Sequence, residues 1–145
     1  FLMEWFFEGN PAPQELPFAY GFTYKIIFKD SDGKNWSYYG KKSFYRAKTQ
    51  PPLQGYKRKR RSMVESDWRT YNGSSSLSKG MEVVSKEILS LANSMNHLSY
   101  LETKLLFEHD VLYNEDNLNA NIGGKYYDNV DRRAGKWLKV FEGQC

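Results

Sequence analysis

Cysteine, long apolar runs and clusters of acidic residues are what this chain of 145 residues has least of. Its single cysteine, Cys145, excludes an intramolecular disulfide and a cysteine-based zinc site, and it favours a reducing, cytoplasmic compartment. No apolar run approaches the ~20 residues of a membrane span. No cluster of aspartate and glutamate points to a two-metal site held entirely by protein carboxylates. The length suits one domain with its own core.

Aromatic residues, in contrast, make up 17% of the chain, and their most regular run predicts a β-hairpin. Large side chains alternate with smaller or polar ones over residues 20–28, which is the period of a strand with one buried face. Residues 30–33 supply a chain reversal that ends in glycine. A second aromatic run at 36–39 completes the hairpin. The two strands place Tyr24 and Tyr38 at corresponding ends.

Positive charge is concentrated in one segment, residues 41–61, which carries nine lysines and arginines and no acid. Pro51, Pro52 and Gly55 interrupt this segment, so we predict that much of it is loop. Mutual repulsion among the cations destabilises a compact state unless a polyanion approaches. Because aromatic residues are interleaved with the cations, we favour nucleic acid as the partner over a solvated face or a localisation signal.

The remaining segments predict an α/β (α+β) domain. Residues 4–17 contain three prolines, which forbid a long helix, and their aromatic side chains predict an arm that packs over the domain. Ser66 or Asp67 is placed to begin a short helix that runs toward Tyr71. Residues 81–91 fit a strand and a helix nearly equally well.

The clearest predicted helix begins at Asn96, where leucines recur at spacings of three and four residues. Beyond it, a high density of asparagine predicts turns. The basic piece around Trp137 either packs as an amphipathic tail or extends a nucleic-acid contact. The apolar positions of the helix are Leu98, Leu101, Leu105, Leu106 and Leu112.

Several stretches, taken in order, resemble the GIY-YIG nucleases, in the phage-type branch of small stand-alone or homing-type endonucleases. The two tripeptides that name the family appear in altered form, the first stretched to Gly-Phe-Thr-Tyr and the second as Tyr-Tyr-Gly. The ordered agreement covers about residues 20–124. The matching stretches are Gly21-Phe22-Thr23-Tyr24, Tyr38-Tyr39-Gly40-Lys41-Lys42, Pro51-Pro52-Leu53, Glu65-Ser66-Asp67-Trp68 and Gly73-Ser74-Ser75.

The resemblance implies a small central antiparallel sheet of three strands flanked by helices, with residues 81–91 as the third strand. It places the nuclease domain at residues 20–125, with a basic insertion at about 43–64. An N-terminal arm, 1–19, and a basic C-terminal extension, 126–145, would complete the chain.

The resemblance also implies a chemistry, the hydrolysis of DNA phosphodiester bonds with one Mg²⁺ or Mn²⁺ ion. Glu102 matches the metal-binding glutamate, and one carboxylate with waters suits Mg²⁺. Tyr24 matches the tyrosine that takes a proton from the attacking water, and Tyr38 would orient the water or the phosphate. An unperturbed tyrosine has a pKa of ~10, so such a base needs nearby positive charge, which Lys41 and Lys42 are placed to supply.

Two further site residues follow from the resemblance. Asn121 matches an asparagine that follows the glutamate helix. The catalytic arginine falls within the insertion, where Arg61, just ahead of the predicted short helix, is the choice and Arg46, Arg58 and Arg60 compete. The residues expected to contact DNA, duplex rather than single-stranded, are Lys41, Arg46, Lys48, Lys57, Arg58, Lys59 and Arg60.

Two other functions fit the sequence. One is a non-catalytic nucleic-acid-binding module that keeps the nuclease fold. The other is a protein-interaction domain whose basic segment meets an acidic partner. A phage-encoded nuclease of homing type would act in the host-cell cytoplasm.

Overall fold

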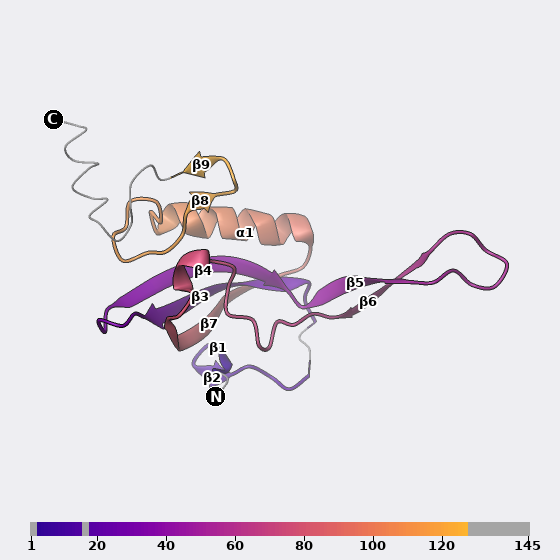
Figure 1. Cartoon of the computed structure of the whole chain (residues 1–145), viewed down its shortest axis with the longest axis horizontal. Helices are drawn as coiled ribbons and strands as arrows, with labels where there is room; N and C mark the ends of the chain where they lie inside the picture. The colour runs from indigo at the N-terminus through magenta and orange to yellow at the C-terminus, as the bar shows by residue number, and fades with distance from the viewer. Residues whose placement is uncertain (1–2, 16–17, 128–145) are drawn as a thin grey trace.

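In the computed structural model, which describes residues 3–15 and 18–127, the chain is built on one mixed β-sheet (Figure 1). Its five strands lie in the order β2-β1-β7-β3-β4. The pair β1–β7 is parallel, and the other neighbouring pairs are antiparallel. The strands are β1 (Trp5–Phe7), β2 (Asn10–Pro11), β3 (Gly21–Lys29), β4 (Asn35–Ser43) and β7 (Glu82–Ala92).

The main sheet therefore has more strands than the three antiparallel strands that were predicted. The predicted hairpin is β3–β4, and the ambiguous segment at 81–91 is the strand β7, as the resemblance implied. The other two strands come from the N-terminal arm, which extends the sheet instead of lying over it. Prolines that forbid a helix still allow short strands, and Glu8 and Gly9, with φ of 52° and 81°, reverse the chain between β1 and β2.

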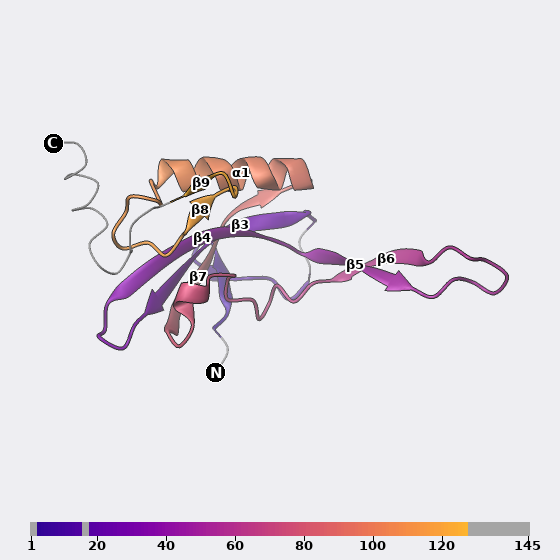
Figure 2. The same ribbon diagram turned by 45° about the horizontal axis from the view of Figure 1, so that its top comes forward.

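One α-helix, α1 (Met95–Glu108), covers one face of the sheet (Figures 1 and 2). Ser94 caps it, because its Oγ accepts a hydrogen bond from the His97 N–H at 3.1 Å. The helix ends earlier than the leucine pattern predicted. Asp110 has a positive φ of 51°, so Leu112 is buried in the turn that follows and not on the helix.

The prediction of flanking helices is wrong for the described residues, where the only other helical element is a single 3₁₀ turn, η1 (Ser76–Ser78). The segment from Asp67 to Tyr71 forms turns instead of the predicted short helix. Two contacts explain the difference. The Ser66 N–H donates to the carbonyl of Phe44 at 2.8 Å, and Trp68 is drawn into the core with 1% exposure.

The face of the sheet opposite α1 holds the main apolar core. Alternation along β3 places Phe22, Tyr24, Ile26 and Phe28 on this face, all 2% exposed or less. Trp5 closes the core, since its Nε1–H donates to the carbonyl of Trp68 at 2.6 Å. The Trp5 ring also meets the rings of Phe22 and Tyr24 edge-on, with centroid distances of 5.0 and 5.4 Å.

The basic segment folds as a second hairpin, β5 (Tyr45–Gln50) and β6 (Arg60–Glu65), which projects from the body of the molecule (Figures 1 and 2). The predicted loop is limited to its tip, residues 51–59. A third, small sheet pairs β8 (Asn121–Ile122) with β9 (Tyr126–Tyr127). The predicted C-terminal extension lies outside the described residues from 128 onward. None of the described helices is long and apolar enough to span a membrane.

Gly40 shows why a glycine follows the two tyrosines of β4. A Cβ built at this position would lie 2.6 Å from Cζ of Tyr24 and nearer still to its phenol oxygen. Tyr24 is buried among Trp5, Phe22 and Tyr71, so its ring has no room to withdraw.

We expect Gly40→Ala to lower the free energy of unfolding by about 1–3 kcal/mol, the usual cost of overpacking a core. Urea denaturation of the purified variant measures this. Asn35→Ala, at an exposed position at the start of the same strand, is the control and should change stability by no more than about 0.5 kcal/mol. Equal stability of the two variants would show that the Tyr24 ring is not held against β4.

Candidate functional site

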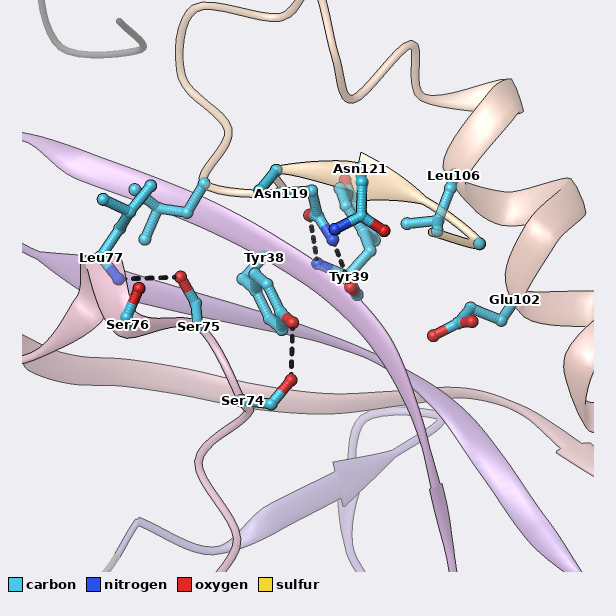
Figure 3. Close-up of a pocket in the computed structure, with 13 residues that line it drawn as sticks. Tyr38, Tyr39, Ser74, Ser75, Ser76, Leu77, Glu102, Leu106, Asn119 and Asn121 are labelled. Carbon is cyan, nitrogen blue, oxygen red and sulfur yellow. Dashed lines mark hydrogen bonds between the residues drawn. The ribbon is translucent and has the colours of Figure 1, made fainter. Parts of the chain in front are cut away.

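A cavity of about 350 Å³ opens beside β4 (Figure 3). Its lining includes Tyr38 and Tyr39 from β4, Glu102 from α1, Ser74 from the turns ahead of β7, and Asn121 from β8. Four segments that are far apart in the sequence therefore meet at this point. Three of the predicted site residues, Tyr38, Glu102 and Asn121, are among those that line it.

Glu102 reaches the cavity from the face of the sheet that α1 covers (Figure 3). Its side chain is 21% exposed, and Lys41 Nζ lies 3.9 Å from its Oε1. The same Nζ donates to Ser99 Oγ at 2.9 Å. Burial raises the pKa of Glu102, and the nearby Lys41 opposes that rise. The carboxylate is thus partly desolvated, which favours a cation that approaches through the cavity.

Tyr38 reaches the same cavity from the other face. Its hydroxyl shares a hydrogen bond of 3.0 Å with Ser74 Oγ, as Figure 3 shows. Gly73 packs against the Tyr38 ring, since a Cβ at this position would lie 3.2 Å from Tyr38 Cδ2. Burial raises the pKa of Tyr38, the Ser74 hydrogen bond lowers it, and the charge of Glu102 adds to the rise. Tyr38 and Glu102 therefore influence each other across one space.

Tyr24 lies beneath Tyr38 in the core. The two rings are 6.2 Å apart, as expected for neighbours on adjacent strands, and the Tyr71 ring is 6.0 Å from Tyr24 on another side. Burial raises the pKa of Tyr24 well above its ordinary value, and Tyr71, Tyr38 and Glu102 add to the rise. With 1% exposure, this phenol is kept neutral and away from solvent.

Lys41 and Lys42 are adjacent in sequence, so they point to opposite faces of β4 and contact different groups. Lys42 Nζ lies 2.6 Å from Asp67 Oδ1 and 4.4 Å from the centre of the Tyr71 ring. Hydrogen bonding to Lys42 lowers the pKa of Asp67. Lys42 thus lies on the face of the sheet that carries Tyr24 and Tyr38, where an aspartate already pairs with it. Lys41, which was expected to supply charge there as well, lies on the α1 side beside Glu102.

The segment after α1 is attached to β4 by Asn119. Its Oδ1 accepts from the Tyr39 N–H at 3.0 Å, and its Nδ2 donates to the Tyr39 carbonyl at 2.7 Å. Leu118 N–H donates to the carbonyl of Ser37 at 2.9 Å, so the pairing continues along the edge. Asn121, the predicted residue, lines the cavity, and its Oδ1 accepts from the Gly124 N–H at 2.9 Å.

None of the four candidate arginines lies among the described residues that line the cavity. Arg58 and Arg61 are exposed on the projecting hairpin, and Arg60 Nε donates to the carbonyl of Pro51 at 3.2 Å. Arg46, at the base of the hairpin, is close enough to Asp67 for its charge to help lower the pKa of that carboxyl. The other lysines expected to contact nucleic acid, Lys48, Lys57 and Lys59, are exposed on the same hairpin.

Sequence reasoning did not single out Tyr71, Ser74 or Asn119. Ser74 lies within Gly73-Ser74-Ser75, a stretch that carried the family resemblance, and Tyr71 lies two residues ahead of it, so the resemblance was the only signal for them. Asn119 stood in the run of asparagines, but nothing in that run distinguished it from Asn121. The contacts that give these residues their places span 36 residues for Ser74 and 80 for Asn119.

The donor atoms of the cavity suit one kind of metal ion. Among the described residues, no group of three histidine, cysteine, aspartate or glutamate side chains is placed to hold an ion, which does not fit a closed zinc centre. One carboxylate beside hydroxyl and amide oxygens does fit Mg²⁺, which keeps several of its waters and binds through one or two carboxylates.

The fold and the cavity together define an α+β domain with a candidate functional site at the edge of its sheet. Residues 5–131 match the family model described as "Putative endonuclease segE, GIY-YIG domain". The chain therefore belongs to this GIY-YIG family of endonuclease domains, which confirms the resemblance seen in the sequence. No curated protein and no solved structure matches the chain significantly.

We expect Asn119→Ala to lower the free energy of unfolding by about 2–4 kcal/mol, because both backbone groups of Tyr39 lose buried partners. Asn121→Ala is the matched control, since the hydrogen bond that it loses is exposed. Denaturant unfolding of the two variants tests this. If Asn121→Ala costs as much as Asn119→Ala, the attachment of this segment to β4 does not depend on Asn119.

Proposed function

We propose that the protein is a divalent-metal-dependent endonuclease that hydrolyses phosphodiester bonds in DNA. The proposal rests on one observation. The Glu102 carboxylate, from α1, and the Tyr38 hydroxyl, from β4, approach from opposite faces of the sheet and line one cavity. Membership of the GIY-YIG family supports the reaction class. The donor chemistry of the cavity supports the metal.

Glu102 is the residue that would hold the ion, Mg²⁺ or Mn²⁺, with waters and substrate phosphate oxygens in the remaining positions. The bound ion would polarise the phosphate and stabilise the leaving oxygen. Lys41, whose Nζ is 3.9 Å from the carboxylate, is placed to contact a phosphate beside it. Asn121, from β8, adds a polar side chain to the cavity lining.

Tyr38 positions the attacking water in this proposal. Its hydroxyl now shares a hydrogen bond with Ser74 and can turn from that partner to a water in the cavity. Tyr24 supports the Tyr38 ring from below, at a centroid distance of 6.2 Å. The role of proton acceptor that the resemblance implies for Tyr24 stays a prediction, and its burial means that the attacking water would have to reach a covered hydroxyl.

Of the candidate arginines, Arg46 is the best placed to stabilise negative charge on the reacting phosphate. The choice of Arg61 rested on its position ahead of a helix that does not form, and Arg61 lies on β6 away from the cavity lining. Arg46, in contrast, is near Asp67, the partner of Lys42 on the tyrosine face. A phosphate that displaces Asp67 would meet both cations. A phage-encoded, homing-type role stays a prediction from the resemblance.

We expect the protein to cleave duplex DNA with Mg²⁺ or Mn²⁺, and Glu102→Gln to slow cleavage about 100-fold or more. Single-turnover assays on supercoiled plasmid and on labelled duplexes measure this, with a chelator as the metal-free arm. Glu108→Gln is the matched control, because Glu108 is on the same helix, exposed and paired with Lys104. Cleavage that persists in chelator, or no cleavage of intact, nicked or branched DNA by the unmodified protein, would contradict the proposal and favour a non-catalytic module.

For the phenol, we expect Tyr38→Phe to reduce the cleavage rate about 100-fold, the usual size of a lost proton-handling or water-orienting group. Tyr100→Phe is the control, since Tyr100 is 64% exposed on α1 and is not among the described residues that line the cavity. The same single-turnover assay compares them, with thermal unfolding as a check of the fold. Equal rates for the two variants would remove Tyr38 from the chemistry.

A further inference from the structure

The projecting hairpin, residues 45–65, hereafter the basic ribbon, extends away from the body of the protein (Figures 1 and 2). Every residue from Arg46 to Arg61 is exposed except Gln50, which is half-buried. A two-stranded hairpin with no core of its own is marginally stable in water, and like charges weaken it further. A ribbon of this kind is suited to being stabilised by a ligand.

The register divides the side chains of the ribbon into two unlike faces. Residues paired directly across antiparallel strands share a face, and successive pairs alternate. One face, hereafter the cationic face, therefore carries three cations with glutamine, serine and valine, and no acid. The opposite face carries one cation, one acid, and tyrosine, alanine, threonine and methionine. The pairs of the cationic face are Arg46–Val64, Lys48–Ser62 and Gln50–Arg60, and the pairs of the opposite face are Tyr45–Glu65, Ala47–Met63 and Thr49–Arg61.

Ser62 gives a second indication on the same face. Its Oγ is buried and has no hydrogen-bond partner among the described residues. A covered hydroxyl without a partner is unfavourable, because it has lost its hydrogen bonds to water. Ser62 pairs with Lys48 in the register, so this hydroxyl lies on the cationic face beside a lysine.

The dimensions of the ribbon match one groove. Strands of six residues are about 20 Å long and lie about 4.8 Å apart. The major groove of B-form DNA, about 12 Å wide, admits a two-stranded ribbon, whereas the minor groove, about 6 Å wide, is too narrow. The deep, narrow major groove of A-form RNA is closed to side chains. Arginine, lysine, glutamine and serine are residue types that hydrogen-bond to base edges in the major groove.

We propose that the basic ribbon enters the major groove of duplex DNA with its cationic face toward the base edges, and that it selects the substrate separately from the cavity. The assignment of DNA as the nucleic acid rests on the proposed function. Beyond that function, the ribbon makes double-stranded B-form DNA with an open major groove the required substrate. At its base, Arg46 and Lys42 both lie near Asp67, so the cationic face continues toward the tyrosine side of β4.

The test measures binding alone, in chelator and with Glu102→Gln, so that cleavage does not interfere. Fluorescence anisotropy compares two duplexes of one sequence, one unmodified and one whose cytosines carry a bulky glucosylated hydroxymethyl group at C5, which fills only the major groove. We expect the blocked duplex to bind at least about 10-fold more weakly, the size of one or two lost base contacts. Netropsin, which occupies the minor groove, should change affinity less than about 3-fold on that basis.

Ribbon variants show which face is responsible. In the same background, Lys48→Ala combined with Arg60→Ala should bind both duplexes with equal, lowered affinity, because the groove contact is gone. Arg61→Ala removes one positive charge from the opposite face, at the residue next to Arg60, and should keep the discrimination between duplexes. Lys104→Ala, on α1, is the control for loss of charge elsewhere. An RNA duplex of the same sequence should lose less affinity from the Lys48→Ala and Arg60→Ala substitutions than the unmodified DNA duplex, because only its phosphates are within reach.

Equal affinity of the unmodified ribbon for both duplexes would overturn the groove proposal, and so would loss of discrimination in Arg61→Ala. Neither result affects the proposed function, which is judged by cleavage of plasmid by the protein with intact Glu102. Ribbon-dependent discrimination in a protein that never cleaves would instead support the groove proposal and overturn the nuclease.

Discussion

β4 is an edge strand of the main sheet, and the candidate site depends on that position. Neighbouring residues of a strand point to opposite faces, so Tyr39 packs beneath α1 while Tyr38 packs over Tyr24 and Gly73. In the interior of the sheet, groups on opposite faces would be separated by backbone. At the edge, Glu102 from one face and Tyr38 from the other line a common cavity.

The edge of β4 that no strand of the main sheet pairs with is covered by residues 116–119. Backbone groups of an unpaired edge strand need partners, and here residues 116–119 supply them through Ser37 and Tyr39. The same segment then carries Asn121 to the cavity wall. The interactions that satisfy the edge strand, among them those of the buried Asn119, therefore also bring Asn121 to the cavity.

The two faces of β4 carry different charged and polar groups. On the helix side, burial raises the pKa of Glu102 and Lys41 opposes the rise, so a cation is favoured there. On the other side, Tyr24, Tyr38 and Tyr71 form a cluster of phenol rings with Lys42 over the Tyr71 ring. The basic ribbon begins beside that cluster and extends beyond it. The proposed metal site, the phenols and the proposed DNA contacts are therefore separated along one strand and its continuation.

Local patterns in the sequence predicted the strands and the helix that form mainly from local interactions. Alternation gave β3 and β4, and the leucine spacing gave α1. The family resemblance added β7 as a strand and Glu102 as a site residue. Patterns of this kind did not predict that the proline-containing arm would extend the sheet, because pairing of Trp5 with Lys86 is a contact between distant segments.

The turn at Trp68 was mistaken for a helix for a similar reason. Its capping signal was present, but burial of Trp68 against Trp5 and Phe44 decided the local conformation. The places of Tyr71, Ser74 and Asn119 likewise depend on contacts with β3 and β4. The choice of Arg61 failed to find support because it relied on that helix.

The central claim is that Glu102 and Tyr38, from opposite faces, form one metal-dependent site at the edge of β4. The most direct test is a crystal of the protein soaked with Mn²⁺, whose anomalous scattering locates the ion independently of any assumed chemistry. We predict a peak within coordination distance of the Glu102 carboxylate, about 2.0–2.3 Å, inside the cavity that Tyr38 faces. A peak held by other residues, with the Glu102 carboxylate left without an ion at saturating Mn²⁺, would contradict it.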